Sequence, residues 1–474
     1  MQSEIASDLT DKTEGGDGVD TSGGSLRDRP NRLLSCGVQY WFCVFFASYL
    51  LLLGPEGLEK ISAVKILILY ISVLALVLLL AVLIAVSLIR RPGPRRFRDY
   101  LEPRALWNPA NLLACAYLVF VLISALLSPW RRMALFSTEN RENACTQFLY
   151  VLCFVLISLW GKPTKTILYV VYGATGLFCL VILLHLLGLN PFGLYGAGKN
   201  FYSPVKGGRT KIFIGTVGNV DLVSAVFSLL LPICLVGGLT ARGWRKLIGL
   251  TLAAVCAVEM VKIRVLAGLV GVAAGGVLSA WILAPFRRKT KLYLLLGLGL
   301  AGAAGLAVLW GFDLKPKPLH ELHEILHGRF SDKFGTGRFF IWRQMLERVP
   351  VRLLFGTGPD TVRQTGLDPF TRYNAAGQLV AVGHLSNAHC LPLQILYCTG
   401  LLSLLAWLGM VGSVLVPWAL RKNKSRASAA IGAGIICFLT NMLFCITSVI
   451  IMPYFWCFLG LLNGEQINKD MPPE

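Results

Sequence analysis

Long apolar runs, separated by short polar turns, form the main pattern of this 474-residue chain. A helix needs about 20 mainly apolar residues to cross the hydrocarbon core of a bilayer. Twelve runs approach or exceed that length, although the seventh and the twelfth are short. The pattern therefore predicts twelve membrane-spanning helices, near residues 38–54, 64–89, 108–128, 145–160, 166–187, 219–239, 246–262, 264–286, 292–312, 390–419, 427–449 and 451–463.

The composition agrees with this pattern. Hydrophobic residues make up 55% of the chain and charged residues 15%, against about 25% charged residues in soluble domains. These values exclude an ordinary soluble enzyme, a disordered chain and a fibrous repeat. The 13 cysteines contain no CxxC pair, so neither a disulfide framework nor a cysteine zinc site is predicted. We expect an all-α polytopic integral membrane protein.

Topology accounts for the net charge of +20. Cytoplasmic loops of membrane proteins collect Lys and Arg, and with twelve spans the basic turns all fall on one side. This arrangement predicts that both termini are cytoplasmic, and it requires no nucleic acid as a partner. The basic turns lie at 90–104, 162–165, 242–246, 287–291 and 421–426.

The same pattern divides the chain into four parts. Residues 1–34 carry seven acids and four bases among Gly and Ser, which predicts a disordered cytoplasmic tail. Transmembrane helices 1–9 occupy 35–312, a large extracytoplasmic loop with amphipathic helices occupies 313–388, and helices 10–12 with a short cytoplasmic tail occupy 389–474. The loop has ten Lys and Arg against seven Asp and Glu. Because a net positive outer loop opposes the topological bias, we expect it to bind an anion.

The stretch 337–342, followed by 355–360, carries the first candidate chemistry. A helix is predicted from here to Arg348, with Thr336 as its N-cap and Arg338 in its first turn. A guanidinium matches the oxygens of a phosphate or pyrophosphate, and a helix N-terminus adds a favourable field for anions. The alternative is an exposed amphipathic helix with a solvated arginine.

A histidine lies at the outer mouth of the tenth predicted span. His389 belongs to the stretch 386–390. An imidazole in this place can act as a general base near neutral pH. The alternative is a histidine that is satisfied by local hydrogen bonds.

Further charged residues lie near the outer ends of the spans. Glu259, Lys262 and Arg264 lie around the turn between the seventh and eighth spans, where ionisable groups mark a site or pair with one another. Arg209 and Lys211 belong to a glycine-rich outer loop. They are candidates for binding a lipid phosphate, or else cations that snorkel at the interface.

The stretch 323–327 spells H-E-x-x-H, through His323, Glu324 and His327. In metalloproteases this pattern binds zinc, with the Glu as general base. His320 shares the same helix face. The pattern supplies the alternative hypothesis of a membrane zinc metalloprotease. Because the motif is short and no further protein ligand is evident, an amphipathic loop helix is the preferred interpretation.

Three stretches combine into a larger pattern. They are G-x-G-R-F-x-I-W at 335–342, G-x-G-P at 356–359 and A-H-x-x-x-L-Q-x-L-x-x-x-G-L-L at 388–402. Together with about twelve spans and a large loop near the C-terminus, they resemble the O-antigen ligase and O-antigen polymerase family of bacterial membrane glycosyltransferases. The resemblance covers roughly residues 145–463.

This resemblance implies a glycosyltransferase C (GT-C)-like fold and transfer of a glycan from undecaprenyl pyrophosphate at the outer face of the bacterial cytoplasmic membrane. The acceptor is a lipid A core sugar for ligases and another lipid-linked repeat for polymerases. Both stay open, as does another surface glycan. Transfer is expected to invert the anomeric centre without a metal or cofactor. Chain-length regulator proteins are candidate partners.

The resemblance also implies roles for individual residues. His389 corresponds to the base that activates the acceptor hydroxyl, and Arg338 to the arginine that holds the pyrophosphate leaving group. Arg264 corresponds to a further arginine near the substrate. Arg209 and Lys211 are lesser candidates for the pyrophosphate or lipid carrier.

The chain departs from the family pattern in three places. Cys390 stands where Asn is usual, Leu404 replaces a small residue, and Ile263 and Val265 flank the upstream arginine in place of Ser and Gly. These departures concern the activity rather than the fold. A remaining hypothesis is a flippase or transporter of lipid-linked glycans, although the chain shows no clear repeated halves and its charged groups cluster at the outer face.

Overall fold

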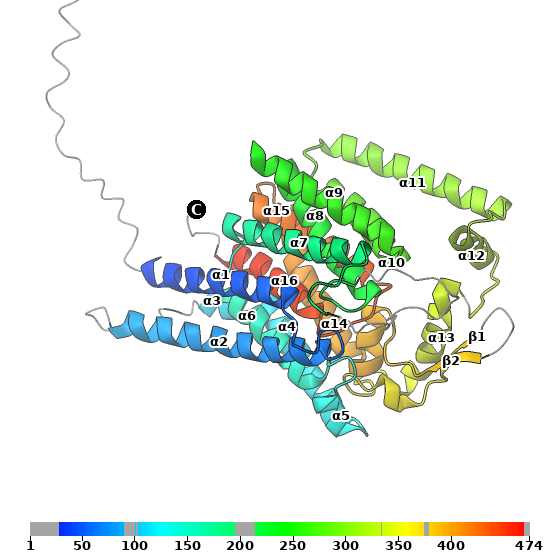
Figure 1. The fold of residues 1–474 in the computed structure, drawn as a ribbon, viewed down its shortest axis with the longest axis horizontal. Coiled ribbons are helices and arrows are strands. Elements are labelled where there is room, and N and C mark those ends of the chain that lie inside the picture. Colours follow the sequence, from blue (N-terminus) through cyan, green and yellow to red (C-terminus); the bar gives the residue numbers. More distant parts are fainter. Residues whose placement is uncertain are drawn as a thin grey trace, which may run out of the picture.

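The computed structural model describes residues 28–89, 100, 103–194, 214–332, 334–373 and 379–468. Helices dominate this part of the chain (Figure 1). The α-helices are α1 (Asp28–Leu51), α2 (Ile61–Ile89), α3 (Pro103–Leu106), α4 (Pro109–Leu127), α5 (Arg131–Phe136), α6 (Ala144–Trp160), α7 (Lys165–Leu186), α8 (Val220–Leu239), α9 (Trp244–Ile263), α10 (Leu266–Leu283), α11 (Arg288–Gly311), α12 (Lys317–Leu326), α13 (Arg338–Arg348), α14 (Leu391–Leu420), α15 (Arg426–Asn441) and α16 (Met452–Ile467).

Each of the twelve apolar runs coincides with one of these helices, which confirms the helical class. Eight helices in the described part of the chain are long and apolar enough to cross a membrane: α1, α2, α4, α7, α8, α10, α11 and α14. Two more, α6 and α15, are apolar but shorter. The chain therefore has the character of a polytopic membrane protein. That all twelve helices cross the bilayer stays a prediction.

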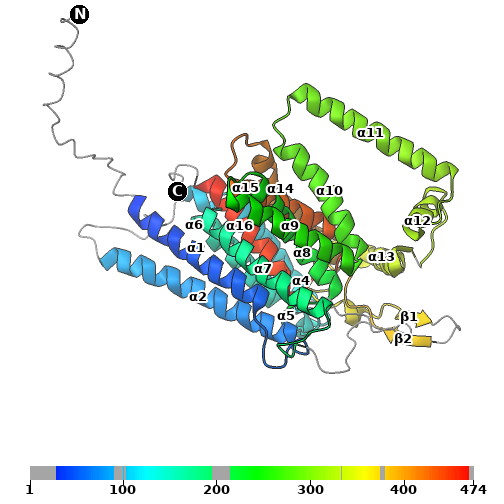
Figure 2. The same ribbon diagram turned by 45° about the horizontal axis from the view of Figure 1, so that its top comes forward.

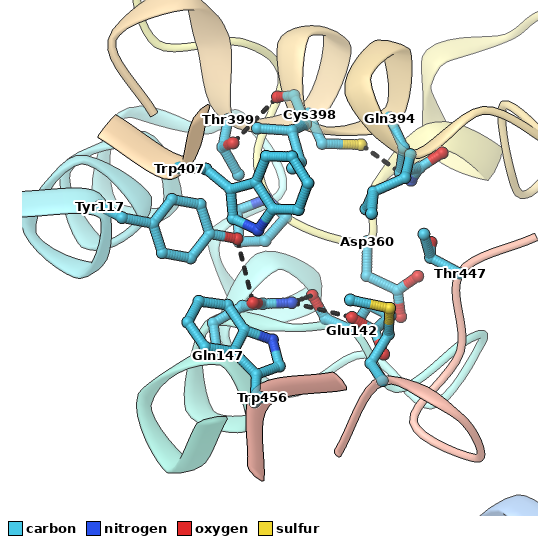
Figure 3. Close-up of a pocket in the computed structure, with 14 residues that line it drawn as sticks. Tyr117, Glu142, Gln147, Asp360, Gln394, Cys398, Thr399, Trp407, Thr447 and Trp456 are labelled. Atoms are coloured by element: carbon cyan, nitrogen blue, oxygen red, sulfur yellow. Dashed lines mark hydrogen bonds between the residues drawn. The ribbon is translucent and has the colours of Figure 1, made fainter. Parts of the chain in front are cut away.

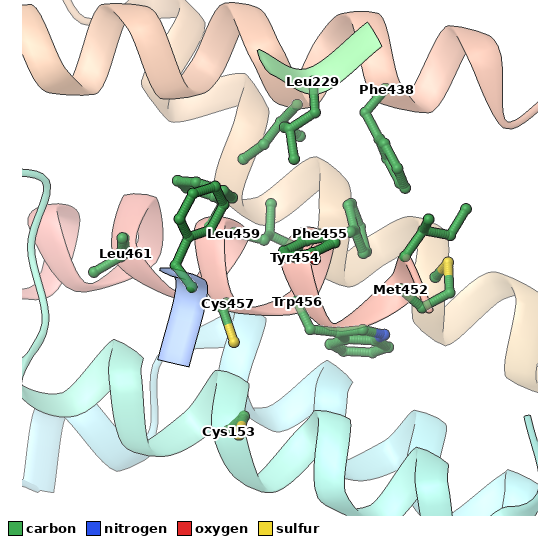
Figure 4. Packing of buried hydrophobic residues seen from close by; sticks show 14 of the residues in the cluster. Cys153, Leu229, Phe438, Met452, Tyr454, Phe455, Trp456, Cys457, Leu459 and Leu461 are labelled. Carbon is green, nitrogen blue, oxygen red and sulfur yellow. The ribbon is translucent and has the colours of Figure 1, made fainter. Parts of the chain in front are cut away.

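The interior of the bundle is built around α16. Tyr454, Phe455 and Trp456 expose at most 2% of their surface, and Figure 4 shows these rings between Cys153 on one side and Phe438 on the other. A helix that is apolar around its whole circumference is buried rather than amphipathic. This explains why the short twelfth run forms an interior helix.

Helices that are distant in sequence pack against one another in the rest of the bundle. The main pairs are α4 with α14, α8 with α15, α10 with α15 and α6 with α16. α11 stands apart from the bundle in both views (Figures 1 and 2), and its apolar stretch has no buried residue. An apolar surface of this extent suits contact with lipid rather than water.

The described residues of 313–388 form short elements at one end of the bundle (Figure 2). A two-stranded antiparallel hairpin, with Phe370 opposite Gly383, adds strands to the predicted all-α class. The elements besides α12 and α13 are the 3₁₀ helices η2 (Phe334–Gly337), η3 (Val349–Arg352) and η4 (Val362–Thr365), and the strands β1 (Phe370–Tyr373) and β2 (Leu379–Gly383).

The helix predicted to end at Arg348 is α13. The prediction that Thr336 caps it is wrong. Gly337 is the N-cap residue, in the left-handed conformation with φ 89°, and no side chain caps the helix. Glycine reaches this conformation without the steric penalty that a Cβ brings, so the chain can turn sharply into α13.

A break in α14 joins the 313–388 segment to the bundle. Gly400 has φ 87° and ψ 176°. Beside it, the N–H groups of Thr357 and Gly358 donate to the carbonyls of Tyr397 and Cys398 at 3.0 and 2.7 Å. A side chain at Gly400 would overlap the backbone of the facing turn. The glycine-rich turn at 356–359 therefore brings its backbone close to α14.

Candidate active site

The backbone around His389 is held from three directions just before α14. The His389 N–H donates to Asn387 Oδ1 at 3.0 Å, and Asn387 Nδ2 donates to Thr447 Oγ1 at 2.9 Å. Trp342 Nε1 donates to the Ala388 carbonyl at 2.9 Å. The histidine therefore sits on a segment that α13 and the connection between α15 and α16 fix in place.

The imidazole of His389 is placed to accept a proton. Its Nδ1 is buried and has no hydrogen-bond partner in the described part of the chain. Burial, and then the positive charge of Arg338, lower the pKa of His389 to about 4. The ring is therefore neutral at neutral pH, the form that a general base requires.

Arg338 is the first residue of α13 and is held by uncharged acceptors. Its Nε donates to the Phe444 carbonyl at 3.0 Å. Its Nη1 donates to the Gly335 carbonyl at 3.0 Å and to Thr336 Oγ1 at 2.6 Å. These bonds fix the guanidinium without neutralising it, and they leave Nη2 without a protein partner among the described residues.

Arg338 differs in this respect from three other arginines of the same segment, although Arg348 is likewise bound by backbone carbonyls. Within the described residues Arg338 forms no ion pair, whereas those three arginines each have a carboxylate partner. The pairs are Arg329–Glu324 at 2.7 Å, Arg343–Asp332 at 2.7 Å and Arg363–Glu139 at 2.9 Å. A fixed and unpaired guanidinium is suited to bind a phosphate or pyrophosphate.

Asp221, near the start of α8, ends the glycine-rich outer loop stretch, but the sequence assigned it no role at the site. The charge of Arg338 acts on its carboxyl group and on Cys445. Cys445 Sγ lies 3.4 Å from the Asp221 carbonyl. α8 and the 444–447 connection therefore meet at Arg338. The sequence signal that could have identified Asp221 is its place in the first turn of an apolar helix, directly after a basic loop.

Arg264 lies at the same end of the bundle. It is exposed, caps α9 and has a left-handed backbone with φ 59°. Gly268, one turn further on, packs against Ser224, which follows Asp221 by one turn of α8. No hydrogen bond or ion pair within the described residues joins Arg264 to Arg338, His389 or Glu259. The candidates Arg209 and Lys211 lie outside the described residues.

Unusual backbone conformations gather around these residues. Among the described residues, five that are not glycine have positive φ: Arg141, Arg264, Thr336, Asp360 and His389. Such conformations cost roughly 1–3 kcal/mol each and concentrate at functional sites. Two of them are residues that the sequence predicted for the site, and Thr336 binds the side chain of a third.

A small cavity of about 30 Å³ lies behind the histidine segment (Figure 3). Gln394 and Thr447 line it. The Gln394 side chain accepts from the N–H of Ala388 at 2.7 Å. The volume is sufficient for about one or two water molecules. The cavity is therefore a polar space directly beneath the backbone that carries His389.

Two buried carboxyl groups face this cavity. Glu142 accepts hydrogen bonds from Tyr150 and Gln147 at 2.8 and 2.9 Å. Asp360 accepts from the side chain of Asn140 at 3.0 Å. Burial raises the pKa of Asp360 to about 6, and burial together with the charge of Asp360 raises the pKa of Glu142 to about 8.

Asn140 connects this pair to the histidine segment. Its Nδ2 donates to Asp360 Oδ1 and also to the Ser386 carbonyl at 2.8 Å. Asn140 thus links the protonation of the two carboxyl groups to the chain segment that precedes His389. Asp360 belongs to the stretch 355–360 that the sequence singled out, but no sequence motif pointed to Asn140 or Glu142.

The H-E-x-x-H stretch forms α12 and its C-cap, as the amphipathic interpretation expects. Glu324 is engaged in its ion pair with Arg329, and His320 Nδ1 lies 2.6 Å from Asp313 Oδ1. Within the described residues no group of three or more His, Cys, Asp or Glu side chains converges as a metal site would require. The donor set therefore does not favour the protease hypothesis.

Because of the two buried carboxyl groups, we expect the folded protein to become less stable as the pH rises. Because the folded protein holds the Glu142 proton up to about pH 8, the free energy of unfolding decreases as pH rises from the ordinary carboxyl pKa through that value. We expect thermal unfolding in detergent to show a lower Tm at about pH 8.5 than at about pH 5.5. Glu142→Gln should flatten this dependence.

Glu139→Gln is the matched control, since Glu139 lies three residues away in an exposed ion pair with Arg363. It should keep the wild-type pH dependence. A wild-type Tm that rises over this range, or an unchanged slope in Glu142→Gln, would contradict the assignment of raised pKa values.

Comparison with known proteins supports one family. Residues 263–408 match the model of the O-antigen ligase family. No curated protein matches the chain. The matched range contains Arg264, Arg338 and His389, and the family implies lipid-linked oligosaccharide substrates in a membrane environment. The match over residues 263–408 therefore supports an assignment to the O-antigen ligase and polymerase family of membrane proteins.

Proposed function

We propose that this protein transfers a glycan from undecaprenyl pyrophosphate to a sugar hydroxyl, at the outer face of the bacterial cytoplasmic membrane. The acceptor is a lipid A core sugar, another lipid-linked repeat or another surface glycan. One observation carries the proposal. The unpaired guanidinium of Arg338 and the segment of neutral His389 are both bound to the short connection 444–447.

The chemistry requires two groups that these residues supply. His389 takes the proton of the acceptor hydroxyl as its oxygen attacks the anomeric carbon. The bond from that carbon to the pyrophosphate breaks, and Arg338 stabilises the charge that develops on the leaving group. Attack on the face opposite to the leaving group inverts the anomeric centre. A preorganised cation at the point where charge develops is often the largest catalytic contribution.

The coupling between Arg338 and His389 supports this division of roles. In the free protein the guanidinium charge contributes to the low pKa of His389. A bound pyrophosphate would compensate that charge, and the pKa of the imidazole would then rise. The base would therefore become stronger when the donor is in place. His389 would therefore stay neutral until the donor binds.

We also propose the orientation and the fold type. The basic turns indicate that both termini are cytoplasmic. The site lies at the bundle end where α9 ends and α14 begins, and α1 begins at the opposite end (Figure 2). The active site would then face outward, within a GT-C-like arrangement of about twelve spans. Arg264 would reach the same donor from the turn between α9 and α10.

Arg338→Lys tests the pyrophosphate role. Lysine keeps the charge but lacks the planar guanidinium. It therefore cannot bind the Phe444 and Gly335 carbonyls, the Thr336 hydroxyl and the anion at the same time. We expect kcat/KM for glycan transfer to fall at least about 100-fold, as for loss of an oxyanion donor. Purified protein in nanodiscs with a lipid-linked donor supplies the measurement.

Arg343→Lys is the matched control on the same helix, because Arg343 forms an exposed ion pair with Asp332. Its activity should stay within about twofold of wild type, in keeping with the small value of surface pairs. Wild-type turnover in Arg338→Lys, or equal losses in the two variants, would count against the assignment.

His389→Ala tests the base and separates the two kinds of transfer. Lipid-linked glycan pools are compared in cells that hold matched levels of wild-type protein, His389→Ala and the exposed-site control His384→Ala. Single repeats that accumulate in His389→Ala identify a polymerase, and full-length polymer on the carrier identifies a ligase. An unchanged pool would remove His389 from the mechanism and favour a transporter.

A further inference from the structure

A groove of about 470 Å³ lies between α7 and α9 on the surface of the bundle, far from the candidate active site. It is formed near the start of each helix. Its lining reaches Leu252 on α9, and α9 ends beside Arg264, so about 18 Å of helix separates the groove from that arginine. The volume falls within the range of roughly 300–1,000 Å³ that small-ligand pockets occupy.

The floor of the groove is apolar and open because two glycines line it. A Cβ at Gly173 would meet no atom within 4 Å, and one at Gly176 would meet Leu252 at 3.5 Å. Leu177 and Ile248 complete the apolar lining. A channel of this width and chemistry, on a helix surface exposed to the bilayer, suits a lipid acyl chain.

The mouth of the groove is cationic and aromatic. The guanidinium carbon of Arg245 lies 5.6 Å from the centre of the Tyr169 ring and 5.5 Å from that of Trp244. Arg245 forms no ion pair within the described residues, and Arg242 and Lys246 beside it are exposed. The local charge is therefore positive and uncompensated by any carboxylate in this part of the structure.

Two hydroxyl groups at the groove lack partners. The Oη atoms of Tyr169 and Tyr172 are buried without a hydrogen bond in the described residues, and Tyr172 exposes only 6% of its surface. The Tyr172 hydroxyl lies against Gly237 of α8, so Tyr169, beneath the Arg245 guanidinium, is the hydroxyl available at the mouth. A buried hydroxyl without a partner is unfavourable, and a phosphate oxygen would accept a hydrogen bond from it.

We propose that this groove binds one anionic glycerophospholipid. An acyl chain would lie along Gly173 and Gly176, and the phosphate would meet Arg245 and the Tyr169 hydroxyl. Positive charge at the mouth favours a net negative headgroup over a zwitterionic one, whose ammonium would be repelled by the Arg245 guanidinium. Basic pockets between helices at the membrane surface bind such headgroups. The inference goes beyond the transfer reaction and does not depend on it.

Native mass spectrometry of the full-length protein in detergent tests the proposal. Dioleoyl phosphatidylglycerol is titrated and compared with dioleoyl phosphatidylcholine. We expect one phosphatidylglycerol to bind at least tenfold more tightly than phosphatidylcholine. Arg245→Ala should weaken phosphatidylglycerol binding at least tenfold, whereas Arg242→Ala, which removes the same charge outside the groove, should change it less than threefold.

Gly173→Leu supplies a variant that keeps every charge and fills the floor of the groove. Because open space surrounds Gly173, the bundle should fold normally, and phosphatidylglycerol binding should be lost. Equal losses in Arg245→Ala and Arg242→Ala would mean attraction to the surface charge alone. That outcome would overturn the proposal. It would also be overturned if wild type bound no phosphatidylglycerol or bound both lipids equally, or if Gly173→Leu kept full binding.

Discussion

The hydrogen bond from Arg338 Nε to the Phe444 carbonyl is the contact on which the arrangement of the site depends. Because the acceptor is neutral, this bond holds the guanidinium in place without compensating its charge. Three residues further along, Thr447 binds Asn387 and through it the His389 backbone. One short connection between α15 and α16 thus sets the spacing of the guanidinium and the imidazole.

A second constraint is the buried polar layer beneath that connection. Glu142 and Asp360 face a cavity that is too small for a substrate, and Asn140 ties them to the chain before His389. Buried carboxyl groups are costly when charged, so they retain protons to higher pH than exposed ones. Proton binding by these carboxyl groups is therefore linked, through Asn140, to the segment that carries His389.

Apolar periodicity predicts every span as a helix, and the motifs alone are sufficient to identify Arg338 and His389 as candidate site residues. The neighbours that complete the site were not predictable, because Asp221 comes near Arg338, and Asn140 and Glu142 near the histidine segment, only through helix packing. The break at Gly400 was also not predictable, since an apolar run gives no sign of an interrupted helix. Its cause is tertiary: another backbone occupies the space that a side chain would take.

The pKa of the His389 imidazole tests most directly whether the Arg338 charge governs the base strength of that ring. NMR of protein with isotope-labelled histidine, assigned by comparison with His389→Gln, measures the pKa. The account predicts a value of about 4 in the free protein, which rises in Arg338→Gln and when a pyrophosphate-bearing donor analogue binds. An ordinary histidine pKa that neither change moves would contradict the account.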